Sequence, residues 1–215
     1  MAAAATTTSV LLLCVAAFLA VAAHAADIKD HGKPAPYKTG DLVTNSCANF
    51  RAYDWTPHLS RKLCESTLRS HKQSAAAKSK RDLALIAMDL LQSAAAKADG
   101  VLRNHSDSGH HSKSTALALQ YCRLDYAAVA RTIPMCRAMV QEYKPVSPSN
   151  SGDNNGDYYD CIARLGNAAA NCWGYVLVDD ELAKVVSKEV AEVFQRATLV
   201  RAMTEVMLGF NDDSH

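Results

Sequence analysis

The chain has 215 residues, of which 49% are hydrophobic, and it carries 23 Lys and Arg against 22 Asp and Glu. This length allows one domain with a substantial core. With a net charge of +1, the chain does not belong to the class of proteins that bind nucleic acid or acidic membranes through overall positive charge. Only 9 Gly and 6 Pro, beside many alanines, favour helices over a loop-rich β fold.

Residues 1–25 have the pattern of a signal peptide. Residues 10–23 are almost wholly apolar, and no Lys, Arg, Asp or Glu precedes Asp27. This run is shorter than the roughly 20 residues of a transmembrane helix, although a membrane anchor is the alternative. Small residues at Ala23 and Ala25 predict cleavage after Ala25. No second apolar run of spanning length follows. We therefore expect a secreted, extracellular protein.

Cleavage would remove Cys14 and leave an even number of cysteines, which in a secreted chain favours disulfides over free thiols. No C-x-x-C pair supports a zinc ribbon or a thioredoxin-like site. Asn104-His105-Ser106 is an N-glycosylation sequon, so Asn104 is a predicted glycosylation site. The six remaining cysteines are Cys47, Cys64, Cys122, Cys136, Cys161 and Cys172.

The segment before residue 80 has two expected parts. Residues 26–46 are polar and interrupted by Pro and Gly, which predicts a flexible leader. Residues 47–78 are expected to form a helical hairpin. Pro57 disfavours a continuous helix through this segment. Two short helices joined by a turn, with Cys47 linked to Cys64, are the simplest arrangement.

Four further stretches repeat apolar residues every three or four positions. This spacing gives each helix one apolar face, as an antiparallel four-helix bundle requires. The predicted fold is therefore all-α, with the bundle in residues 80–208 after the N-terminal hairpin. Pro134 is expected to kink the second bundle helix. The predicted helices are 80–102, 115–143, 157–178 and 182–208.

Helix geometry limits how the cysteines of the second and third bundle helices can pair. Cys122 and Cys136 would lie roughly 21 Å apart on one helix, whereas a disulfide needs Cα atoms about 4.4–6.8 Å apart. Cys161 and Cys172 are excluded in the same way. In an antiparallel pair, Cys122–Cys172 and Cys136–Cys161 nest one inside the other. Crossed pairing of Cys122 with Cys161 would need parallel helices, which the short polar connection between them disfavours.

Candidate chemical sites are few. The sequence contains no signature of a serine hydrolase, zinc protease, P-loop or dinucleotide site. The densest group of titratable residues lies in a Ser/Gly-rich connection, where a solvated loop is favoured over a metal site. We therefore predict no enzyme activity, no metal and no cofactor. This group consists of His105, Asp107, His110 and His111.

Two aromatic residues of the bundle helices allow specific predictions. Tyr126 lies on an apolar face and is expected to be a core residue with a hydrogen-bonded hydroxyl. Trp173 follows Cys172 and is equally suited to packing inside the protein or to facing a partner.

Three segments resemble motifs of the plant invertase/pectin methylesterase inhibitor family, and the resemblance as a whole extends over residues 47–208. The sharpest is Tyr121-Cys122-Arg123-Leu124-Asp125-Tyr126-Ala127, which is similar to the family's Cys-x-x-x-Tyr-Ala motif. Residues 167–172 resemble the small-residue run before its fourth cysteine, and residues 156–158 resemble the turn opening the third bundle helix. The resemblance implies an inhibitor-type domain in residues 47–210. It also implies that Cys47–Cys64 and Cys122–Cys172 are the family bridges, so Cys136 and Cys161 form an extra pair.

By this resemblance the protein is expected to inhibit pectin methylesterase in a stoichiometric complex, with bundle helices laid over the substrate cleft. We expect exposed polar helix faces to make the contact. Residues 157–159 read Asp-Tyr-Tyr where invertase inhibitors of the family carry Pro-Lys-Phe, which weakens the case for invertase as the target. Inhibition of cell-wall or vacuolar invertase is one alternative, and a non-inhibitory binding module is another. The expected location is the apoplast, and the free protein is expected to be monomeric, without nucleic-acid or membrane partners.

Overall fold

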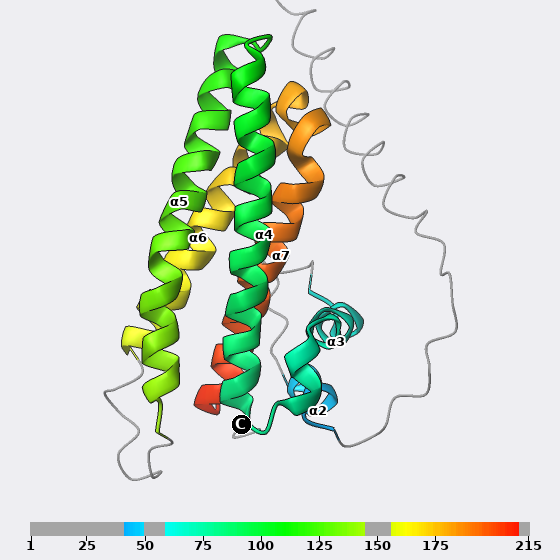
Figure 1. Cartoon of the computed structure of the whole chain (residues 1–215), viewed down its shortest axis with the longest axis vertical. Coiled ribbons are helices and arrows are strands. Elements are labelled where there is room, and N and C mark those ends of the chain that lie inside the picture. Colours follow the sequence, from blue (N-terminus) through cyan, green and yellow to red (C-terminus); the bar gives the residue numbers. More distant parts are fainter. Residues whose placement is uncertain (1–40, 50–58, 145–155, 211–215) are drawn as a thin grey trace, which may run out of the picture. The chain divides into compact units, whose positions relative to one another are not determined.

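The computed structural model describes residues 41–49, 59–144 and 156–210. The predicted signal peptide and most of the predicted leader lie outside the described residues. All regular secondary structure in the described residues is helical (Figure 1). None of the described helices is both long and apolar enough to cross a membrane.

Four long helices form an antiparallel bundle, as the sequence predicts. Neighbouring contacts join α4 to α5, α5 to α6, α6 to α7 and α7 to α4, so α4 lies diagonally opposite α6. Figure 1 shows the four helices running side by side. Their bounds are Lys80–Ser108 for α4, Lys113–Glu142 for α5, Gly156–Val178 for α6 and Asp180–Leu208 for α7.

Capping residues set the ends of these helices. At the start of α4, Ser79 Oγ accepts a hydrogen bond from Asp82 N at 3.2 Å, and Asp82 Oδ2 accepts from Ser79 N at 3.0 Å. This capping box satisfies backbone donors that have no partner within the helix. Gly109, with φ 70°, ends α4, and Gly209, with φ 82°, ends α7. Glycine adopts this left-handed conformation without the steric cost of a Cβ.

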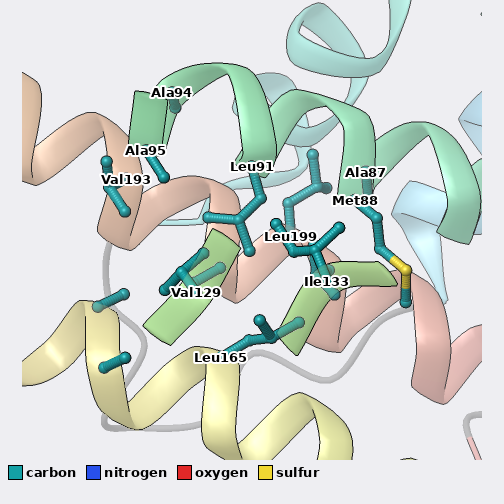
Figure 2. Packing of buried hydrophobic residues seen from close by; sticks show 14 of the residues in the cluster. Ala87, Met88, Leu91, Ala94, Ala95, Val129, Ile133, Leu165, Val193 and Leu199 are labelled. Carbon is teal, nitrogen blue, oxygen red and sulfur yellow. The ribbon is translucent and has the colours of Figure 1, made fainter. Parts of the chain in front are cut away.

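The apolar faces of the four helices meet in one core. Figure 2 shows Leu91 of α4, Val129 and Ile133 of α5, Leu165 of α6 and Leu199 of α7 pointing into the shared interior. Each of these side chains is buried. Burial of whole aliphatic side chains stabilises a fold by roughly 1.5–3 kcal/mol each, so this interior holds the helices in register.

Two disulfides join α5 to α6. The Cα atoms are 4.8 Å apart in Cys122–Cys172 and 5.6 Å apart in Cys136–Cys161, in the nested arrangement expected for antiparallel helices. Pro134 does not end α5, which is helical on both sides of it. A proline removes one backbone hydrogen bond, and the buried neighbours Ile133 and Cys136 hold the chain in place.

Two short helices precede the bundle, α2 (Leu42–Ala48) and α3 (Arg61–Ser70), and η1 (Lys72–Ala76) leads into α4. The third disulfide joins Cys47 to Cys64, with Cα atoms 5.8 Å apart. Helices α2 and α3 contact each other and α4. Residues 50–58, which include the expected turn, lie outside the described residues.

The predicted flexible leader extends too far, because α2 already begins at Leu42. Thr44 N donates to Asp41 Oδ1 at 2.8 Å, and this bond caps the helix. Asp41 also forms an ion pair with Arg69 of α3 at 2.7 Å. The hydrogen bond from Thr44 and then the Arg69 guanidinium lower the pKa of Asp41. A side-chain cap of this kind is worth about 1 kcal/mol. It adds to the Cys47–Cys64 disulfide, which links α2 to α3.

Candidate functional site

Several large apolar side chains on α5 and α6 stay exposed at the end of the bundle where α4 meets α5. On α5 they lie at positions i, i+4 and i+7, which is one side of a helix. Leu124 is 63% exposed and Val178 is 83% exposed. We name these exposed side chains, together with the half-buried Tyr175 beside them, the α5/α6 face. It consists of Leu117, Tyr121, Leu124, Tyr175 and Val178.

A groove lies between the two helices on this face. Its volume is about 500 Å³. Tyr121 and Tyr175 stack across it, with ring centroids 5.8 Å apart and an angle of 25° between the rings. The groove is therefore aromatic and aliphatic along one side, with acids and hydroxyls at its end. Its lining is Ser112, Ser114, Thr115, Leu117, Ala118, Tyr121, Tyr175, Val178, Asp179, Asp180 and Glu181.

The Cys122–Cys172 disulfide lies directly beneath this face. Cys122 follows Tyr121 in α5, Cys172 lies one helical turn before Tyr175 in α6, and both sulfurs are buried. The bridge fixes the spacing and axial register of the two helices at this level. The face is consequently held in one arrangement before any partner binds.

A hydrogen-bond network closes the acidic end of the groove. His111 Nδ1 lies 2.8 Å from Glu181 Oε1, and Ser112 N donates to Glu181 Oε2 at 3.3 Å. Thr115 Oγ1 lies 2.9 Å from the same carboxylate and 2.8 Å from Asp179 Oδ2. The bond with His111, followed by those from Thr115 and Ser112, lowers the pKa of Glu181 to about 2. Glu181 is therefore ionised at neutral and at mildly acidic pH.

We expect Glu181→Gln to destabilise the protein above pH 4.5 and to lose this effect in acid. A carboxylate with a lowered folded-state pKa contributes stability above its unfolded value, and that stability disappears as pH falls towards about 2. Urea unfolding at several pH values measures the difference from the wild type. Glu189→Gln on the same helix is the matched charge control. If the difference in unfolding free energy between Glu181→Gln and the wild type stayed constant down to pH 2, the lowered pKa of Glu181 would be contradicted.

The histidine-rich segment differs from the predicted solvated loop, because α4 continues to Ser108 and includes His105. The rings of His105 and His111 are 6.2 Å apart, and His111 Nε2 lies 3.0 Å from the His105 carbonyl oxygen. His111 thus connects the end of α4 to the start of α7. The described residues contain no group of three or more His, Cys, Asp or Glu placed to hold a metal ion.

The sequence-based predictions for Tyr126 and Trp173 have different outcomes. Tyr126 is a core residue, 2% exposed, but its hydroxyl has no hydrogen-bond partner among the described residues, so the expected bonded hydroxyl is wrong. Burial raises the pKa of Tyr126, because the phenolate would be poorly solvated there. Trp173 is half-buried and stacks on Phe194 of α7, with ring centroids 6.1 Å apart. It therefore packs within the bundle.

The residues of the α5/α6 face were not singled out from the sequence. Leu117, Leu124 and Val178 lie off the buried stripe of their helices, and a single exposed leucine is common on soluble proteins. Their grouping becomes visible only when two helices are placed side by side.

A disulfide-braced helical bundle with an exposed apolar face is a scaffold suited to binding another protein. The comparison with known families defines the class: the chain belongs to the plant invertase/pectin methylesterase inhibitor family, whose model matches residues 41–208. Members of this family inhibit pectin methylesterase or invertase. A search of curated proteins finds no match to this chain.

Proposed function

We propose that this protein is a secreted inhibitor of pectin methylesterase that places its α5/α6 face over the substrate cleft of the enzyme. The observation that carries the proposal is the exposed aromatic and aliphatic face on two helices joined by a disulfide, in a family of inhibitors. The complex is expected to contain one copy of each protein.

The chemistry of the face supports a protein partner. Interfaces are apolar and aromatic at their centre and polar at their rim, and a few central side chains carry most of the binding energy. Here Tyr121 and Tyr175 lie centrally, with Asp179, Asp180 and Glu181 at one edge. This apolar centre differs from the expectation, drawn from the sequence, that exposed polar helix faces make the contact. Because the helices are already fixed, little freedom is lost on binding.

The start of α6 supports the esterase over invertase as the target. Tyr158 packs against Tyr143 with ring centroids 5.7 Å apart, and its hydroxyl donates to the Met139 carbonyl at 3.3 Å. Tyr159 packs against Phe210 at 5.3 Å. These rings stand where invertase inhibitors of the family carry Pro-Lys-Phe, and their packing against the bundle favours a structural role for this segment.

We also propose the remaining features of a secreted inhibitor: cleavage after Ala25, an apoplastic location, an inhibitor domain over residues 47–210 and a monomeric free state. Asn104 is exposed in the last turn of α4. It lies about 200° around the helix from buried Leu102, so a glycan there would project from the outer face of α4, diagonally opposite α6.

Mass spectrometry of the protein secreted from a eukaryotic host tests the sequon. We expect a glycan mass on the peptide containing Asn104 that disappears in Asn104→Gln, with inhibition unchanged because Asn104 lies on the outer side of α4 and the α5/α6 face is formed by two other helices. An unmodified peptide from secreted protein would contradict this prediction.

Parallel titrations test the proposed function. The oxidised, folded protein is added to a plant pectin methylesterase and to an acid invertase between pH 5 and 7. The proposal predicts that esterase activity falls to an end point near one equivalent while invertase stays active. Inhibition of invertase alone would name the other target of the family. Full activity of both enzymes would instead support a non-inhibitory binding module.

A further inference from the structure

A second surface lies at the other end of the bundle, where α4 begins and α5 ends. Lys78, Lys80 and Arg81 surround the start of α4, and Lys144 follows the end of α5. Arg81 Nη1 donates to the Gln141 carbonyl at 3.4 Å, which ties the two helix ends together. We name these four cations the basic end.

The cations of the basic end are at least partly exposed, and the one hydrogen bond given for their side chains within the described residues is the bond from Arg81 to the Gln141 carbonyl. Arg69, Lys97 and Arg137 each form an ion pair with a carboxylate. In contrast, no ion pair joins any cation of the basic end to a carboxylate of the described residues. The nearby acids are Asp82, which is occupied by the capping box of α4 and interacts electrostatically with Arg81, and Glu142 and Asp157, which both lie close enough to Tyr158 beside the groove to act on it. The positive N-terminal end of α4 adds to the local potential.

A groove of about 380 Å³ lies within this surface. It is lined by Ser79, Lys80, Arg81, Tyr143 and Met207. It thus combines two cations and a hydroxyl with an aromatic ring and a thioether. The Tyr143 ring is held edge to face by Tyr158, at an angle of 89°. A uronic acid unit has a carboxylate and a sugar ring with an apolar face. Cations can bind the carboxylate, and an apolar wall beside them can accept the face of the ring, so this groove has the features needed to bind one such unit.

We propose that the basic end binds an acidic polysaccharide, namely pectin whose methyl esters have been removed. This inference rests on the proposed function, because hydrolysis of each methyl ester by the target enzyme releases methanol and leaves a carboxylate on the polymer. The product is a chain of negative charges, and the basic end offers four positive charges and a groove for one sugar unit. The inhibitor would then be retained where esterase has already acted.

The polymer and the enzyme would bind at different places. Lys144 and Leu117 are 27 residues apart in sequence, and a helix rises 1.5 Å per residue, so the basic end and the α5/α6 face lie about 40 Å apart along α5. Both surfaces are therefore accessible at the same time. Attraction between exposed charges is screened by salt, and release of counterions makes polyanion binding strongly salt-dependent.

Binding to immobilised polygalacturonate, in low salt with a chelator to exclude calcium, tests the proposal. We expect Lys78→Gln/Lys80→Gln/Arg81→Gln to bind at least tenfold more weakly than the wild type. The matched control is Lys184→Gln/Lys188→Gln/Arg164→Gln, which removes the same charge from exposed positions of α7 and α6 and should stay within twofold. Highly methyl-esterified pectin should bind the wild type at least tenfold more weakly than the de-esterified polymer.

Equal losses in both triple variants would overturn the proposal, because bulk charge would then explain the binding. Equal affinity for esterified pectin, for RNA or for anionic lipid vesicles would overturn it as well. The same variants are titrated against pectin methylesterase to separate the two proposals. Unchanged inhibition with lost polymer binding is the expected result for the basic-end variant. If the wild type bound the polymer but left the esterase active, the proposed function would be wrong while the proposed polymer binding would stand.

Discussion

Replacing Leu124 and Val178 by aspartate is expected to weaken inhibition of pectin methylesterase at least 100-fold. Both side chains belong to the α5/α6 face and would be desolvated in the complex, where an unpaired charge is costly. A loss of 100-fold corresponds to about 2.7 kcal/mol. Because they are 63% and 83% exposed in the free protein, the free energy of unfolding should change by no more than about 0.5 kcal/mol. Inhibition titrations and urea unfolding measure the two effects separately.

Leu177→Asp is the matched control for this double variant. Leu177 is 67% exposed and neighbours Val178 in sequence. It points about 200° around α6 from Tyr175, away from the α5/α6 face. Inhibition by this variant should remain within about threefold of the wild type. Equal loss of inhibition in Leu177→Asp, or full inhibition by the double variant, would place the contact elsewhere on the bundle.

Removing the Cys122–Cys172 bridge is expected to lower the free energy of unfolding by about 3.5 kcal/mol. The paired variant is Cys122→Ala/Cys172→Ala. The bridged residues are 50 apart in sequence, but the intact Cys136–Cys161 bridge lies inside this loop and shortens its effective length to about 25 residues. Closing such a loop reduces the entropy of the unfolded chain, and the reduction grows with loop length. The same variant should weaken inhibition, because the two helices of the α5/α6 face lose their link. Denaturant unfolding under oxidising conditions gives the stability.

Cys136→Ala/Cys161→Ala is the matched comparison. Its cysteines are also buried and its sequence separation is 25, so with the other bridge intact the expected loss is similar, about 3.5 kcal/mol. This pair lies farther from the α5/α6 face, so inhibition should be retained if the variant folds. A difference of more than about 1 kcal/mol between the two variants would indicate that native-state packing, rather than loop entropy, governs the bridges.

The sequence predicts the bundle well because its physical signals are local. Apolar residues at helical spacing identify each long helix, and the geometry of an antiparallel pair limits Cys122, Cys136, Cys161 and Cys172 to the nested arrangement. Helix ends are less predictable, since they depend on single caps. The capping bond from Thr44 to Asp41 starts α2 inside the expected leader, and α4 continues through His105 to Ser108.

The α5/α6 face is harder to predict for a different reason. In the sequence, a leucine outside the buried stripe of its helix cannot be told apart from any other solvent-exposed residue. No local sequence pattern relates Tyr121 to Tyr175. Their stacking depends on the axial register of α5 against α6, which is a tertiary property. The hydroxyl of Tyr126 is a similar case, because its surroundings are formed by packing between helices.

Footprinting of the complex tests most directly whether the α5/α6 face contacts the enzyme. The protein is exposed to hydroxyl radicals alone and with enough pectin methylesterase to bind it fully, and oxidation is measured residue by residue. We predict that Tyr121 and Tyr175 become protected in the complex, while Tyr143 at the basic end keeps its reactivity. Protection at Tyr143 with unchanged reactivity at Tyr121 and Tyr175 would contradict the account.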